Sequence, residues 1–217
     1  MVTGVVAAPA KAANTAKGSA AKLALVSRTY AKAVELLDTP AATYLHSRGL
    51  YPTGGWDGLR TSILHYPGVG PRPALIAPID GLDGSLVGLH RTYLDHGGSK
   101  LDVASPRLTL GQARGCAIRL GQVTNELVVC EGLEDGLTLY QEWGIPVWVA
   151  GGASFMPAMA IPGGITSLII AADNDEAGDR AAYRTADALS TGGREISIAR
   201  PSPGFKDFND QLLGRTS

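Results

Sequence analysis

Short apolar runs alternate with helical patterns in the C-terminal part of the 217-residue chain. Four of these runs have the length and composition of buried strands: 127–130, 147–150, 168–172 and 196–199. A helical pattern follows the first run, to about Trp143, and another follows the third run, from about Asp179 to Leu189. Strands that alternate with helices are typical of a parallel sheet covered by helices. The pattern therefore predicts a small α/β domain over residues 126–217.

The N-terminal part has a different pattern, which predicts a mixed α+β lobe over residues 21–125. Helical periodicity spans about residues 21–37, and a shorter helix over 41–48 is ended by Gly49. Two apolar strands joined by a turn rich in Asp and Gly predict a β-hairpin within residues 74–93.

The composition of the remaining segments predicts neither a signal peptide nor a transmembrane helix. Residues 1–20 are rich in alanine, weakly basic and poor in large apolar side chains, so we expect a disordered leader and not a signal peptide. No segment approaches the roughly 18 consecutive apolar residues of a transmembrane helix. Cys116 and Cys130 form no CxxC motif, so we expect two reduced core thiols in a cytoplasmic protein.

Charge is divided unevenly along the chain, although the net charge is only −1. Residues 1–125 carry 13 Lys and Arg against 7 Asp and Glu, a balance of +6. Residues 126–217 carry 6 Lys and Arg against 13 Asp and Glu, a balance of −7. A basic front half joined to an acidic back half suits a protein that holds a polyanion with one lobe and a metal ion with the other.

The two aspartates that follow the third predicted strand, Asp173 and Asp175, are the centre of the candidate chemistry. Gly178 is expected to let the chain turn into the next helix. The carboxyl ends of parallel strands collect ligands and ions, and carboxylate oxygens suit Mg²⁺ or Mn²⁺. An EF-hand is excluded, because its fifth and twelfth loop positions would be Ala177 and Arg184. Simple capping of the next helix stays open for this pair taken alone.

Two further acidic groups argue against capping as the whole explanation. Glu131 follows the first strand, and Asp135, four residues later, shares a helix face with it. Asp207 and Asp210 follow the last strand, next to Lys206. Because neighbouring parallel strands bring their carboxyl ends together, we expect the acidic groups to meet at one edge of the sheet.

The order of these groups resembles the Toprim domain, the catalytic module shared by bacterial-type DNA primases, type IA and type II topoisomerases and some nucleases. Its Glu after the first strand is matched by Glu131, and its later Asp-x-Asp by Asp173 and Asp175. The primase form has Glu-Gly-x-x-Asp at the first strand, which Gly132 and Asp135 complete.

Two more regions extend the resemblance to phage- and plasmid-type primases. The primase motif Lys-Asp-x-Asp is matched by Lys206 and Asp207, but Asn209 replaces the second acid, which is displaced to Asp210. The front lobe of these primases carries a Tyr-Leu-x-x-Arg-Gly-Leu motif, a Pro-Ile…Gly hairpin and two basic positions. Their matches occur in the same order here: Tyr44, Leu45, Arg48, Gly49, Leu50, Pro78, Ile79, Gly84, Arg91 and Lys100. The resemblance covers about residues 41–213.

The resemblance implies a DNA primase-type nucleotidyltransferase that uses Mg²⁺ or Mn²⁺ to make short RNA primers on single-stranded DNA from NTPs. It implies these catalytic residues: Glu131, Asp135, Asp173 and Asp175. It implies these metal ligands: Glu131, Asp173, Asp175, Asp207 and Asp210. It implies these contacts to nucleic acid or nucleotide: Arg91, Lys100, Arg107 and Lys206.

The same resemblance implies replication of a phage, plasmid or other mobile element, in the cytoplasm at the nucleoid, with a helicase or a zinc-binding module acting in trans. Two alternatives stay open. A Toprim nuclease would use the same acids to cleave nucleic acid, and a non-catalytic replication subunit would use the fold only to bind DNA. A topoisomerase is disfavoured, because no room remains for the domain that bears its nucleophilic tyrosine.

Overall fold

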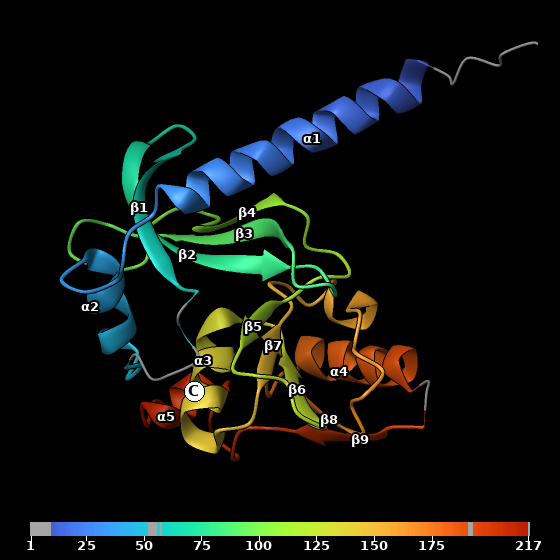
Figure 1. Ribbon diagram of the computed structural model, residues 1–217. Coiled ribbons are helices and arrows are strands. Elements are labelled where there is room, and N and C mark those ends of the chain that lie inside the picture. The colour runs from blue at the N-terminus through green and yellow to red at the C-terminus, as the bar shows by residue number, and fades with distance from the viewer. Residues whose placement is uncertain (1–9, 52–55, 57, 191–192, 217) are drawn as a thin grey trace, which may run out of the picture.

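Two sheets, one above the other in Figure 1, form the body of the protein. The computed structural model describes residues 10–51, 56, 58–190 and 193–216. The first sheet is an antiparallel meander whose strands lie in chain order: β1 (Arg60–Tyr66), β2 (Gly70–Asp80), β3 (Leu86–Tyr93) and β4 (Arg107–Gly111). The predicted hairpin is confirmed, since β2 and β3 pair antiparallel with Ala74 opposite Tyr93.

The second sheet has the order β5-β7-β6-β8-β9 and carries the predicted parallel strands. Its strands are β5 (Ile118–Leu120), β6 (Glu126–Cys130), β7 (Val147–Val149), β8 (Ser167–Ala171) and β9 (Glu195–Ala199). Four of them run parallel, and β5, which the apolar pattern did not predict, adds antiparallel to β7 at one edge. The predicted α/β class of this part is confirmed.

Helices flank the second sheet, as Figure 1 shows. They are α3 (Leu133–Trp143), the short 3₁₀ helix η1 (Met156–Ala158), α4 (Glu176–Leu189) and α5 (Phe208–Leu212). The helix α3 lies very close to the sheet, because a Cβ atom on Gly136 would be 2.3 Å from a methyl carbon of Val149. The absence of a side chain at Gly136 therefore allows the first turn of α3 to pack closely on the strands.

The N-terminal helix α1 (Ala10–Ala31) differs from the prediction at both ends. Residues 1–9 of the predicted leader lie outside the described residues, and from Ala10 onward the leader is helical, because its alanines favour the helix. The helix ends at Ala31 and not near residue 37. Val34 instead exchanges two backbone hydrogen bonds of 2.9 Å with Thr61, which adds an extended segment beside β1.

The second helix, α2 (Pro40–Ser47), begins where the sequence predicted and packs beneath the first sheet. The Thr39 hydroxyl accepts a hydrogen bond from the backbone N–H of Ala42 and caps its first turn. Gly49 follows the helix at a φ of 68°, the left-handed conformation expected of a residue that ends a helix.

A single hydrophobic core crosses from the first sheet and α2 into the second sheet and α3. It contains Leu45 and Leu75 from the N-terminal part together with Val128, Leu137 and Phe208 from the C-terminal part. A second cluster, around Trp148, fills the other side of the second sheet. The division into a leader, a lobe and a domain at residues 20 and 125 stays a prediction, whereas the packing between the two sheets is extensive and apolar.

Among the described residues, no helix combines the length and the apolar character that a membrane crossing requires.

Candidate active site

The aspartates after β8 are held by the start of α4. Asp175 is the N-cap of α4, and its Oδ1 accepts a 2.7 Å hydrogen bond from the backbone N–H of Gly178. A Cβ atom on Gly178 would lie 2.5 Å from the carbonyl oxygen of Asp173. Gly178 therefore lets the chain turn into α4 by allowing this close approach of the two backbone segments. Capping and ligand binding are compatible here, because capping occupies only one carboxylate oxygen of Asp175.

Glu131 and Asp135 lie at the carboxyl end of the neighbouring strand. The strand β6 pairs parallel with β8, with Val129 opposite Ile170, so that both acidic loops leave the same edge of the sheet. Asp135 belongs to the first turn of α3, where its Oδ1 accepts a 3.0 Å hydrogen bond from the backbone N–H of Asn209. This hydrogen bond joins the segment that carries Asp207 and Asp210 directly to Asp135.

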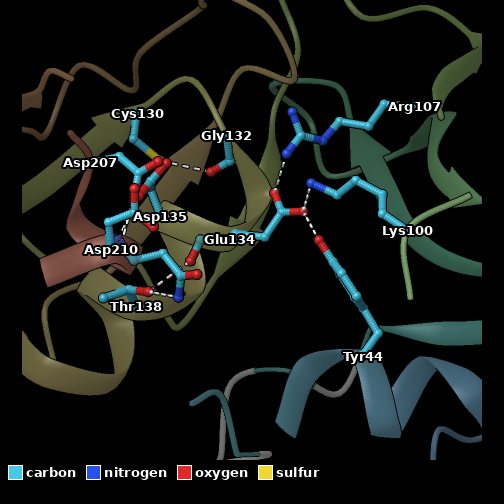
Figure 2. Close-up of polar contacts among 11 residues, drawn as sticks. Tyr44, Lys100, Arg107, Cys130, Gly132, Glu134, Asp135, Thr138, Asp207 and Asp210 are labelled. Carbon is cyan, nitrogen blue, oxygen red and sulfur yellow. Dashed lines mark hydrogen bonds and ion pairs between the residues drawn. The ribbon is translucent and has the colours of Figure 1, made fainter. Parts of the chain in front are cut away.

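Asp207 and Asp210 lie at the start of α5. Asp207 is the N-cap, and its Oδ1 accepts a 2.7 Å hydrogen bond from the backbone N–H of Asp210. Figure 2 shows both side chains beside Asp135. Asn209, which replaces the acid of the primase motif, is 2% exposed, and its amide donates to the Arg48 carbonyl at 2.9 Å and to the Thr138 hydroxyl at 3.0 Å. These two hydrogen bonds join α5 to both parts of the protein.

Mutual repulsion shows that these carboxyl groups lie together. Burial, together with the charges of Glu131, Asp207 and Asp175, raises the pKa of Asp173 to about 6, against the opposing charge of Lys206. Burial, followed by the charges of Asp207 and Asp173, raises the pKa of Asp135 to about 8. Acidic groups from three strand ends therefore share one electrostatic environment, in agreement with the sequence analysis.

The donor set fits a hard divalent cation. Among the described residues, no three His, Cys, Asp or Glu side chains are already arranged around one point as ligands. The group is nevertheless made of carboxylates alone, which Mg²⁺ and Mn²⁺ prefer, and a cation would relieve the repulsion that raises the two pKa values. The assignment of individual ligands stays a prediction.

Asn174 lies between Asp173 and Asp175 in the loop after β8, and it fixes this loop to the segment before α5. Its side-chain amide donates to the carbonyl oxygens of Phe205 at 2.8 Å and Pro201 at 3.0 Å. Its backbone N–H donates to the carbonyl oxygen of Lys206 at 2.7 Å. The loops that carry Asp173 and Asp207 are therefore bonded to each other, and Lys206 lies close enough to oppose the rise in the pKa of Asp173.

Two of the predicted basic residues, Lys100 and Arg107, face the acidic part across the boundary between the sheets. Both form ion pairs with Glu134, at 3.2 Å for Lys100 Nζ and 3.1 Å for an Arg107 guanidinium nitrogen. The hydroxyl of Tyr44 donates to the same carboxylate. Figure 2 shows these three side chains converging on Glu134 from the N-terminal part of the chain.

Glu134 has a role that the sequence analysis did not find. Its side chain is only 7% exposed. Burial raises the pKa of this carboxyl, but Arg107, Lys100 and the Tyr44 hydroxyl outweigh burial and hold it at about 2. Glu134 is thus ionised at neutral pH. Its position three residues after Glu131 was visible in the sequence, but its partners lie 27 to 90 residues away along the chain.

Arg91 lies apart from the other basic residues. Side chains alternate between the two faces of a strand, and Arg107 lies opposite Thr92 on β3, so Arg91 is on the other face of the sheet. Its guanidinium donates to the Tyr93 hydroxyl at 3.1 Å. His90, on the face toward the acidic part, is 4% exposed, and burial lowers its pKa to about 4.

Comparison with protein families agrees with this geometry. Residues 126–217 match the Toprim domain, and this part of the chain is a Toprim domain. Residues 20–120 match a domain of unknown function, DUF7146. A search among curated proteins gave no match.

Solved structures of primases share the fold of most of the chain. A DNA primase domain from Pseudomonas aeruginosa matches with a TM-score of 0.61 and 16% identity, over 90% of this chain and 75% of that one. The DnaG catalytic core matches with a TM-score of 0.55 and 17% identity, over 91% of this chain and 76% of that one. The primase fragment of the bacteriophage T7 primase-helicase matches with a TM-score of 0.52 and 20% identity, over 80% of this chain. The chain spans 65% of that fragment.

At these identities the matches show a shared fold, and they extend across both sheets and not only over the Toprim domain. The protein therefore has a primase-like Toprim fold that is similar to solved primase cores over most of its length.

Proposed function

We propose that this protein is a metal-dependent nucleotidyltransferase that synthesises short RNA on single-stranded DNA from NTPs. The observation that carries the proposal is the meeting of two opposite charge groups at the first turn of α3. Carboxyl groups from three strand ends repel one another around Asp173 and Asp135. Glu134 directly precedes Asp135 in the helix, and Lys100 and Arg107 converge on it from the N-terminal lobe. Phosphoryl transfer between nucleotides needs both charges, because a cation is held by acids and phosphates are held by basic groups.

The acidic residues have separate roles in this proposal. Asp173, Asp175 and Asp207 would hold Mg²⁺ or Mn²⁺, with Asp210 at the margin of the set. The ion would supply charge neutralisation for the phosphates. Glu131 would orient the attacking 3′-hydroxyl and accept its proton. Asp135, whose pKa of about 8 keeps it mostly protonated at neutral pH when no cation is bound, would complete the acidic face. Each of these roles is a prediction that mutation can test.

The basic residues would bind the polyanions. Lys100 and Arg107 are the best placed, because they face the Toprim acids and the Arg107 side chain is 47% exposed. Lys206, beside the acids, would contact a nucleotide phosphate. Arg91 would contact the template only along the other face of the sheet, so we expect it to contribute less.

Partners and setting follow from the relatives. One matched fragment belongs to a phage primase-helicase, and a matched Aquifex aeolicus structure contains a zinc-binding domain beside its RNA polymerase domain. We propose that this protein likewise works with a helicase or a zinc-binding module in trans, in the replication of phage, plasmid or another mobile element, at the nucleoid in the cytoplasm.

The test is RNA synthesis on a defined template. The protein is incubated with single-stranded DNA, labelled NTPs and either Mg²⁺ or Mn²⁺, with and without a chelator, and the products are separated on a denaturing gel. We expect short RNA oligomers that vanish with the chelator and with Asp173→Asn. The matched control is Asp102→Asn, which removes one exposed carboxylate from the N-terminal lobe and should leave synthesis unchanged.

The same tubes distinguish the alternatives. DNA cleaved in the absence of NTPs, and protected by Asp173→Asn, would instead establish a Toprim nuclease. Neither product, even with a helicase or a zinc-binding module added, would leave a DNA-binding subunit and refute the proposal.

A further inference from the structure

A buried carboxylate joins the two parts of this protein, and it is not one of the acids that face the candidate metal site. Glu134 receives an ion pair from Lys100, an ion pair from Arg107 and a hydrogen bond from Tyr44. These three partners come from α2, from the segment between β3 and β4, and from β4 itself, as Figure 2 shows. One side chain of the Toprim domain thus fixes three separate segments of the N-terminal lobe.

Stability alone does not account for this arrangement. Removing a carboxylate and two cations from water is costly, and apolar side chains of similar volume stabilise an interior equally well. An apolar alternative exists in this protein, since the core that crosses between the two parts contains Leu45, Leu94 and Leu133. The ionic contact is better explained by the fixed orientation that it gives to the side chains of Lys100 and Arg107.

The position of Glu134 connects the two charge groups of the site. Glu134 and Asp135 are consecutive in the first turn of α3, so their side chains leave the helix about 100° apart. Asp135 is repelled by Asp207 and Asp173, whereas Glu134 binds Lys100 and Arg107. The spacing between the acids and the cations is therefore set by one helical turn that lies tightly against the sheet.

The cations keep the capacity to bind a second anion. One carboxylate faces two positive charges, so a net positive charge remains on this cluster. The side chain of Arg107 is 47% exposed and that of Lys100 is 24% exposed, whereas that of Glu134 is 7% exposed. A phosphate could approach the outer side of both cations while Glu134 holds their inner side.

We propose that Glu134 is a positioning residue for the transfer reaction: it holds Lys100 and Arg107 in the place where they bind a phosphate of the nucleotide or of the nucleic-acid strand. The inference rests on the proposed function, because it names the phosphate-binding groups of the same site. Glu134 itself touches no substrate.

The test compares binding with turnover in Glu134→Gln. This variant removes the charge and keeps the shape, so the two cations lose their fixed place and also lose a competing anion. We expect binding of an oligo-dT strand, measured without metal, to be equal or tighter, with a log–log salt slope steeper by about 0.7. We expect kcat for RNA synthesis to fall about a hundredfold, with little change in KM for NTP. Glu142→Gln, on an exposed position of the same helix, is the control and should change neither quantity.

Two further variants keep the test decisive if Glu134→Gln folds poorly. Tyr44→Phe removes the hydroxyl that orients the carboxylate and leaves every charge in place, so we expect unchanged strand binding and a kcat about tenfold lower. Glu134→Asp keeps the charge but withdraws it by one methylene group. It should restore the wild-type salt slope without restoring kcat.

Three results would overturn the inference. A faster reaction in Glu134→Gln would show that the carboxylate merely competes with phosphate. Parallel losses of binding, turnover and melting temperature in both Glu134→Gln and Tyr44→Phe would show a structural role only. If the wild-type protein makes no RNA, the proposed function fails, and the salt dependence of oligo-dT binding then tests the inference by itself. An unchanged slope in Glu134→Gln would show that Glu134 does not position cations that bind phosphate.

Discussion

The crowded carboxyl groups predict that the protein without metal loses stability as the pH rises. Asp135 is the most affected of them, because burial and the charges of Asp207 and Asp173 raise its pKa from 3.8 to about 8. The folded protein then keeps a proton that the unfolded chain releases near pH 3.8. This stabilisation is complete below the unfolded-state pKa and is lost as the pH rises through the folded-state pKa. The variant Asp135→Asn removes the titrating group and preserves its shape.

The magnitude follows from the pKa interval. One pKa unit corresponds to about 1.4 kcal/mol, so the rise from 3.8 to about 8 corresponds to roughly 6 kcal/mol at most. About 3 kcal/mol of this should be lost between pH 5 and pH 8. The variant should match the wild type at pH 5 and be more stable at pH 8 by about 3 kcal/mol, because it lacks the carboxyl group that the wild type must ionise.

The assay is urea unfolding, followed by tryptophan fluorescence, in a chelator from pH 5 to pH 8 and again with Mg²⁺. Bound cation favours the ionised carboxylates, so Mg²⁺ should flatten the pH dependence of the wild type and stabilise it more than the variant. Asp102→Asn is the control for removing a single negative charge from an exposed position. His90, whose pKa burial lowers to about 4, makes both proteins more stable as the pH rises toward 7, so the comparison between variant and wild type decides. A variant no more stable than the wild type at pH 8 in the chelator would refute the reasoning.

Two further substitutions test the framework of the site. Gly178→Ala places a methyl group 2.5 Å from the Asp173 carbonyl oxygen. We therefore expect a loss of roughly 1–3 kcal/mol in the free energy of unfolding, together with loss of RNA synthesis. The control is Gly163→Ala, whose added methyl group meets nothing within 4 Å and should leave the free energy of unfolding unchanged in the same urea titration. Asn209→Ala removes the two hydrogen bonds that its amide donates to Arg48 and Thr138, so the free energy of unfolding in urea should fall by roughly 2–4 kcal/mol. A fall below about 0.5 kcal/mol would show that the amide does not hold α5 in place.

The sequence revealed the acidic part of the site because that part depends on local patterns. Apolar runs of strand length predicted β6 and β8, and acids directly after such runs lie at one edge of a parallel sheet. The meeting of Glu131, Asp173 and Asp207 followed from this rule without any long-range information. The arrangement of individual ligands did not follow, because it depends on side-chain rotamers and on the ion itself.

The contact between the two parts of the chain could not be predicted in the same way. Tyr44 was recognised only as part of a resemblance to the front lobe of primases, and the sequence pattern gave no reason to single out Glu134. Their hydrogen bond joins residues 90 positions apart, and no periodicity along the chain encodes such a pairing. The early end of α1 has a related cause, since Val34 leaves a plausible helical pattern to pair with Thr61.

The amide of Asn174 has a consequence for the energy of metal binding. An ion that must draw separate loops together loses part of its binding free energy to the ordering of the chain. Here the loop after β8 and the segment before α5 are joined by hydrogen bonds of 2.7 to 3.0 Å before any ion arrives. Only side-chain rotation then remains to be ordered on binding. The affinity of the acids for a divalent cation should therefore depend on a residue that contributes no ligand, through the preorganisation it provides.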